Sequence, residues 1–141
     1  GNHRDLHRLI RRQRQMCIRD RSSIVTGLNQ MDNNFDAAML YPVDFPLVKT
    51  DTIKSLIRRY FQHPAGIISP AYNGRMGHPV LISVGYFDEI KNAPPDQGAR
   101  IVIHGYEGKS DLKIVEVDDK GVRSDIDTPE DYQNAKSYND E

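Results

Sequence analysis

The sequence has a single cysteine, Cys17, among 141 residues, which excludes an internal disulfide framework and a cysteine-based zinc cluster. No apolar run approaches the ~20 residues that cross a bilayer, and no uninterrupted apolar core of a secretory signal is present. The five histidines lack metal-ligand spacing, and no Ser-His-Asp or Cys-His arrangement is present. The sequence also has no internal repeat or low-complexity linker. We therefore expect one cytoplasmic domain, long enough to bury a core and without a membrane partner.

Charge is unevenly distributed along the chain. Residues 1–21 carry seven arginines against two aspartates, a formal +5, whereas the remaining residues carry a formal −6. A basic run can bind nucleic acid or a membrane surface, but this one has neither an aromatic side chain nor a long apolar face. Residues 13–21 are similar to translated sequencing-adaptor sequence joined to a reading frame. We therefore predict that residues 1–21 are a basic extension, foreign to the fold or disordered, and that the domain covers 22–141. We expect no nucleic-acid partner.

A helix start is the clearest local signal. Thr128 can cap the helix with its hydroxyl, and Pro129 suits the first helical position because its missing N–H costs nothing there. Asp131 follows three residues after the cap, where its carboxylate can accept from the N–H of Thr128. The residues therefore predict a helix from 129 onward.

Two acidic side chains stand directly before this helix. Asp125 and Asp127 alternate with Ile126, as at the end of a strand whose apolar residue faces a core. Carboxylates at such a strand end could hold Mg²⁺, which takes few protein oxygens and keeps several waters. They could also do no more than favour the helix dipole. The spacing alone leaves both interpretations open.

Asp44 belongs to a second acidic segment. It follows an apolar run at residues 35–41 of the kind that a buried parallel strand shows. Pro42 and Pro46 bracket Asp44, end the strand and keep the backbone extended. Asp44 would then stand at the carboxyl end of a strand, the edge where open α/β sheets bind ligands. A loop aspartate in a proline-rich turn is the alternative.

The remaining elements alternate between helix and strand, which predicts an α/β layer fold with a mixed sheet. Apolar spacing and breakers predict helices at 22–30, 50–62 and 86–93, and strands at 36–41, 66–70, 79–83, 112–117 and 122–126. The composition of residues 118–121 predicts a hairpin turn between the last two strands. Residues 98–104 are β-branched and have the propensity of a strand.

Four motifs occur in a fixed order, at residues 44–48, 70–80, 98–100 and 125–131. This order resembles the nucleotidyltransferases of molybdenum cofactor maturation, especially the molybdopterin cytidylyltransferase-like branch. The resemblance runs from residue 22 to about residue 138. It implies a Rossmann-like nucleotidyltransferase layer fold of the nucleotide-diphospho-sugar transferase type, with residues 98–104 helical. The family's opening glycine-rich phosphate loop has no match, so we expect the C-terminal part of such a domain, truncated at its N-terminal side.

The resemblance also implies a reaction. A nucleoside monophosphate would pass from CTP, GTP or another NTP to the phosphate of a molybdopterin-type cofactor, with release of pyrophosphate. Asp44 and Asp127 would be the catalytic pair that holds Mg²⁺, and a molybdoenzyme acceptor could be a partner. Without the glycine-rich loop, we expect the chain alone to be inactive. The alternatives are a sugar-phosphate-type nucleotidyltransferase and a non-catalytic truncated module.

The substrate side of the predicted site depends on residues 74–79. Glycines there allow a ligand to approach closely, and Arg75 could hold a phosphate through its planar fork. The alternative is a glycine-rich turn with Arg75 in water and His78 packed beneath it. Arg100 could contact a phosphate or form a salt bridge. The resemblance favours a loop that lines the pterin side of the cleft, and the residues it implies for substrate binding are Arg75, Gly77, His78, Pro79 and Arg100.

Overall fold

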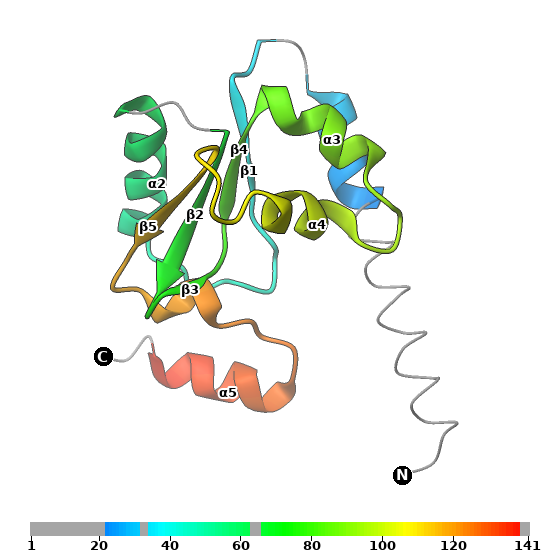
Figure 1. Cartoon of the computed structure of the whole chain (residues 1–141). Helices are drawn as coiled ribbons and strands as arrows, with labels where there is room; N and C mark the ends of the chain where they lie inside the picture. Colours follow the sequence, from blue (N-terminus) through cyan, green and yellow to red (C-terminus); the bar gives the residue numbers. More distant parts are fainter. Residues whose placement is uncertain (1–21, 32–33, 63–65, 139–141) are drawn as a thin grey trace. The chain divides into compact units, whose positions relative to one another are not determined.

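The computed structural model describes residues 22–31, 34–62 and 66–138 (Figure 1). The chain divides into two compact units, which the sequence did not predict. One unit combines Gly1–Ala38 with Ser83–Lys109, and the other combines Met39–Ile82 with Ser110–Glu141. Within the described ranges no helix is long and apolar enough to span a membrane.

Helices are the main elements in the described part of the first unit. It contains a helix over residues 22–30, a 3-10 turn, and the helices α3 (Phe87–Asn92) and α4 (Gly98–Gly105), which contact each other (Figure 1). These helices confirm the predictions for 22–30, 86–93 and 98–104. In α4, Ala99, Val102 and Ile103 are buried at helical spacing, so packing of one face overrides the β propensity of the segment.

The five strands form one mixed sheet. Its strands are β1 (Ala37–Leu40), β2 (Ile67–Tyr72), β3 (Arg75–Met76), β4 (Val80–Ser83) and β5 (Leu112–Glu116). The order is β1-β4-β2-β3, and β5 also pairs with β2. Strand β2 runs antiparallel to β3 and β4 and parallel to β5, which confirms the predicted mixed sheet. Its first five residues are buried, so β2 is the centre of the core.

Helix α2 (Thr50–Gln62) contacts β2 and β5 in the second unit. The predicted helix is confirmed, but its buried face is narrower than the apolar spacing suggested. Thr52 and Leu56 are buried one turn apart, whereas Ile57 is 40% exposed and Phe61 74% exposed. The buried stripe therefore follows Thr52 and Leu56, and Thr52 has a polar partner described below.

The predicted hairpin after β5 is wrong. Residues 120–123 form a 3-10 helix, η2, and residues 124–127 have no regular structure before helix α5 (Pro129–Tyr138). The Asp119 carboxylate accepts from the N–H of Gly121 at 2.9 Å, so the side chain turns the backbone where a hairpin would need strand pairing. Val122 is fully buried, and its carbonyl oxygen accepts from the N–H of His78. That oxygen is therefore not used in pairing with β5, as the predicted hairpin would need.

Candidate functional site

Two loops meet η2 and the segment that follows it. The N–H of Ile126 donates to the carbonyl oxygen of Asp44 at 2.8 Å. The N–H of His78 donates to the carbonyl oxygen of Val122, also at 2.8 Å. Residues 122–126 therefore tie together the Asp44 loop and the glycine loop, which are far apart in sequence.

Two glycines make this crossing possible. A Cβ atom at Gly77 would lie 2.1 Å from the carbonyl oxygen of Val122, and one at Gly121 would lie 2.2 Å from the carbonyl oxygen of Leu47. Both distances are far below any van der Waals contact, so the backbones touch where any side chain would intrude. The motif glycine Gly77 is buried and serves this backbone contact.

The acidic side chains form an electrostatic cluster around Asp127. Asp125 is the main cause of the raised pKa of Asp127, and Asp44 also raises it. Asp127 is exposed and Asp44 is half-buried, so both carboxylates remain accessible from water. Within the described ranges, no group of three or more His, Cys, Asp or Glu side chains could hold a metal ion. Asp44 and Asp127 together offer two carboxylates, a number that Mg²⁺ can use because that ion completes its shell with water and phosphate oxygens.

The predicted capping box of α5 is confirmed. The Asp131 carboxylate accepts from the N–H of Thr128 at 2.9 Å and from its hydroxyl at 2.7 Å, while the N–H of Asp131 donates to the Thr128 hydroxyl at 3.1 Å. The same carboxylate accepts from the N–H of Asp127 at 3.2 Å. These hydrogen bonds lower the pKa of Asp131, and the bond from the Thr128 hydroxyl has the largest effect. Asp131 therefore holds the backbone of Asp127 at the helix start.

Thr128→Ala should lower the free energy of unfolding by about 1 kcal/mol, because it removes the hydroxyl that caps α5. Urea unfolding followed by circular dichroism measures this loss, and Gln133→Ala, on the exposed surface of the same helix, is the control. The lowered pKa of Asp131 sets the pH dependence. The contribution of the Asp131 carboxylate to the free energy of unfolding is complete above the ordinary carboxyl pKa of 3.8. It is lost as the pH falls through the lower pKa of the folded state. Equal stability of Thr128→Ala and Gln133→Ala would contradict the capping role.

His78 packs beneath the loop that carries Asp44. Its ring centroid lies 4.7 Å from that of Phe45, tilted by 56°. Burial lowers the pKa of His78, against a raising effect of Asp44, and Arg123 lowers it as well. Its Nδ1 atom is buried and finds no hydrogen-bond partner within the described part of the chain. This geometry favours the packed-histidine interpretation.

The other residues predicted to bind substrate differ in accessibility. Pro79 is fully buried and follows His78 through a cis peptide bond, so its side chain packs in the interior. Arg75 is exposed on β3, directly after the β2–β3 turn at Asn73 and Gly74. Arg100 is exposed on α4 and belongs to the first unit. Their binding roles remain predictions.

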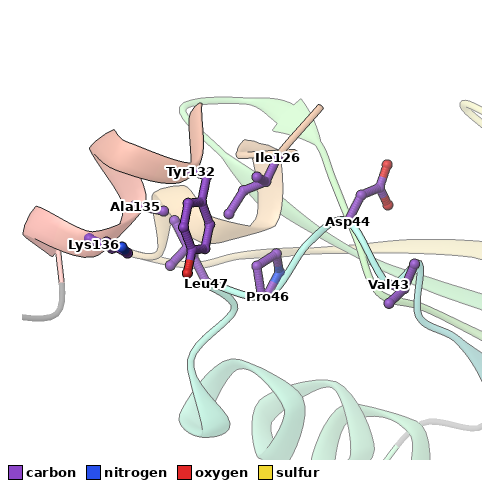
Figure 2. A pocket seen from close by; sticks show the side chains of 8 residues that line it. All are labelled: Val43, Asp44, Pro46, Leu47, Ile126, Tyr132, Ala135 and Lys136. Atoms are coloured by element: carbon purple, nitrogen blue, oxygen red, sulfur yellow. The ribbon is translucent and has the colours of Figure 1, made fainter. Parts of the chain in front are cut away.

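A groove of about 400 Å³ opens beside Asp44 (Figure 2). Its floor is mainly apolar, with Asp44 towards one end and Lys136 towards the other. The Lys136 ammonium lies 4.7 Å from the centroid of the Tyr132 ring. The lining residues are Val43, Asp44, Pro46, Leu47, Ile126, Tyr132, Ala135 and Lys136. Reasoning from sequence did not identify the α5 wall, although Tyr132, Ala135 and Lys136 have the i, i+3, i+4 spacing of one helix face.

Comparison with known proteins gives a family match and several structural neighbours. A family model described as the MobA-like NTP transferase domain matches residues 2–111. No curated protein sequence matches the chain significantly.

The solved structures that are similar to this chain include three of Rv0371c or its homologue. A homologue of Mycobacterium tuberculosis Rv0371c, from Mycobacterium sp. strain JC1, is 26% identical, with a TM-score of 0.69 over 83% of this chain and 57% of that chain. Rv0371c from M. tuberculosis H37Rv is 24% identical, with a TM-score of 0.71 over 83% and 59%. Its manganese complex is 23% identical, with a TM-score of 0.65 over 79% and 57%. The chain thus spans less than three fifths of each structure, and the predicted nucleotidyltransferase-type α/β fold is confirmed.

Proposed function

Because the chain belongs to the family of MobA-like NTP transferase domains, we propose that it supplies part of the active site of a molybdenum cofactor nucleotidyltransferase. The enzyme would transfer a nucleoside monophosphate from CTP or another NTP, GTP included, to the phosphate of a molybdopterin-type cofactor. The observation that carries the proposal is the hydrogen bond from Ile126 to Asp44, since it joins the two acidic segments of the family motif. The proposed location is the cytoplasm, and the proposed downstream partner is a molybdoenzyme.

The reaction needs no protein nucleophile. A phosphate oxygen of the acceptor attacks the α-phosphorus of the nucleotide, a new P–O bond forms, and the α–β phosphoanhydride bond breaks to release pyrophosphate. Asp44 and Asp127 are the residues proposed to hold Mg²⁺. When bound there, the ion would neutralise the developing charge on oxygen and align the phosphates.

The chain's own residues prepare this pair of carboxylates. Asp131 fixes the backbone of Asp127 through the helix cap, and Ile126 fixes the backbone of Asp44. The negative charges of Asp125 and Asp44 raise the pKa of Asp127, which means that their repulsion would be relieved by a bound cation. One structural neighbour was solved as a complex with manganese, so Mn²⁺ is a suitable probe ion for this fold.

The groove beside Asp44 supports an acceptor with a ring system. Its apolar floor can cover a planar ring, and the Lys136 ammonium can meet a polar group at the end opposite Asp44. Arg75 is proposed as a phosphate contact because it is exposed and its guanidinium can bind two oxygens. Gly77, His78 and Pro79 would act by holding the conformation of their loop. Arg100, which is exposed on α4, stays a proposed phosphate contact.

The test uses a protein that carries this chain within its complete reading frame. Mg²⁺-dependent pyrophosphate release from CTP and from GTP is measured with a molybdopterin-type cofactor and, separately, with sugar 1-phosphates. Asp44→Asn and Asp127→Asn should each lower kcat by about 100-fold, the scale on which removing one charge-stabilising group acts. Asp88→Asn, exposed on α3, is the control and should leave kcat unchanged.

Release with sugar phosphates alone would favour the sugar-phosphate nucleotidyltransferase. An absence of release with every acceptor would favour a non-catalytic module. Full activity of Asp127→Asn would contradict the proposed roles of the acidic pair. The isolated 141-residue chain should show negligible turnover with any of these acceptors.

A further inference from the structure

Asp119 is a carboxylate inside the protein, only 2% exposed. One of its oxygens accepts from the N–H of Lys49 at 2.8 Å and from the hydroxyl of Thr52 at 2.6 Å. The other oxygen accepts from the N–H of Gly121 at 2.9 Å. A buried carboxylate is costly unless donors of this kind surround it. The three bonds therefore fix the positions of all four residues relative to one another.

Together with the hydrogen bond from Ile126 to Asp44, these bonds close a ring of protein chain that contains Asp44 and ends next to Asp127. From Asp44 the backbone runs to Lys49 and crosses to Asp119 through the hydrogen bond. It then runs from Asp119 to Ile126, whose N–H returns to the carbonyl oxygen of Asp44. Asp119 closes one end of the ring, and Asp44 and Asp127 lie at the other end.

Two further contacts support the ring. Between its ends, Gly121 touches the carbonyl oxygen of Leu47 so closely that a Cβ atom would lie 2.2 Å from it. Thr52 lies in the first turn of α2, which contacts β2 and β5, so the Asp119 end is anchored to the core. Residues 41–49 and 124–128 contain no helix or strand. Their positions therefore depend on cross-links such as these.

We infer that Asp119 is a positioning residue that fixes the separation of the Asp44 and Asp127 carboxylates. The inference rests on the proposed function, because it concerns the pair proposed to hold the ion. Asp119 acts through the backbone of residues 44–49 and 119–126 and touches neither carboxylate. Asparagine cannot replace it, because an amide has one acceptor oxygen and its NH₂ group would face a donor.

The test is made on the 141-residue chain with Mn²⁺ alone. Binding is titrated by electron paramagnetic resonance for the wild type, Asp119→Asn, Thr52→Val and a control, Ile82→Val. Ile82 is fully buried on β4, outside the ring, so its replacement disturbs packing without touching the cross-links. Asp119→Asn should raise the Kd for Mn²⁺ about tenfold, as loss of a residue that orients a metal ligand does. Thr52→Val, which leaves the carboxylate and removes one hydrogen bond, should raise the Kd by about threefold, and Ile82→Val should leave it unchanged.

Amide hydrogen exchange provides a readout that needs no metal. The N–H of Ile126 should exchange about tenfold faster in Asp119→Asn, while that of Ile67, which donates to Asp111 at 2.8 Å, keeps its rate. If Asp119→Asn does not fold, both measurements are made on Thr52→Val.

The outcomes separate the two proposals. If the wild type binds Mn²⁺ but Asp119→Asn and Thr52→Val bind it as tightly, the positioning role is overturned and the proposed function stands. If the wild type binds no Mn²⁺, the metal pair is wrong and the positioning role falls with it, even if Ile126 exchanges faster. The inference is supported if Asp119→Asn and Thr52→Val bind Mn²⁺ more weakly and exchange the Ile126 N–H faster, while Ile82→Val shows neither effect.

Discussion

Replacing both Asp44 and Asp127 by asparagine should weaken Mn²⁺ binding by about a hundredfold or more. The double variant removes both negative charges and keeps the size of each side chain. Asp125 would remain beside the site. The Kd is measured by titrating the 141-residue chain with Mn²⁺ and recording the free ion by electron paramagnetic resonance.

Each single variant should show most of this loss, because both side chains would be needed to hold the ion. Asp88→Asn, exposed on α3 in the first unit, is matched in chemistry and should bind Mn²⁺ as the wild type does. Mg²⁺ should compete with Mn²⁺ in the wild type, since both ions take oxygen ligands. Tight Mn²⁺ binding by the double variant would mean that the ion binds elsewhere.

Gly77→Ala and Gly121→Ala should each destabilise the fold by about 3 kcal/mol or more, because a methyl group would be forced against backbone. The nearest atoms would be carbonyl oxygens of Val122 and Leu47, at 2.1 and 2.2 Å. Backbone cannot swing aside as a flexible side chain does, so the loop crossing must open. For a domain whose total stability is about 5–15 kcal/mol, this is a large fraction.

Urea unfolding followed by circular dichroism measures the two losses. Gly105→Ala is the control, because a Cβ atom there meets nothing within 4 Å. It lies at the end of α4 and should be neutral or slightly stabilising, since alanine favours helix over glycine. If Gly121→Ala unfolds at the urea concentration of the wild type, the close crossing of the two loops is wrong.

Most helices and strands could be predicted because their signals are local. The capping box of α5 rests on Thr128 and Asp131, three residues apart, and every predicted bond of that motif is present. The segment at 98–104 shows the limit of propensity. Its β-branched residues favour a strand, yet the burial of Val102 and Ile103 on one face makes it helical. The family resemblance predicted this helix correctly where composition did not.

The turn after β5 could not be predicted because its cause is not local. A stretch of Asp, Lys and Gly suits a hairpin and an Asp-x-Gly turn equally. The donors that decide between them include Lys49 and Thr52, about seventy residues away in sequence. The spacing of Asp119 and Gly121 was the one available signal for the turn, and nothing local pointed to burial of the carboxylate.

The candidate site was predicted in part. The sequence motifs named Asp44 and Asp127, and the structure joins their segments through Ile126. The motif that contains His78 and Pro79 did not predict that these side chains pack inside the protein, since the same residues suit an open ligand-binding loop. The groove wall on α5 was missed because the helix was considered only for its cap.

We propose that Asp44 and Asp127 together hold one divalent ion. Crystals of the chain grown with Mn²⁺ and measured at the manganese absorption edge test it most directly. We expect one anomalous peak per chain, within coordination distance of a carboxylate oxygen of each residue. A peak bound by other residues, or no peak where the two carboxylates point apart, would contradict the claim.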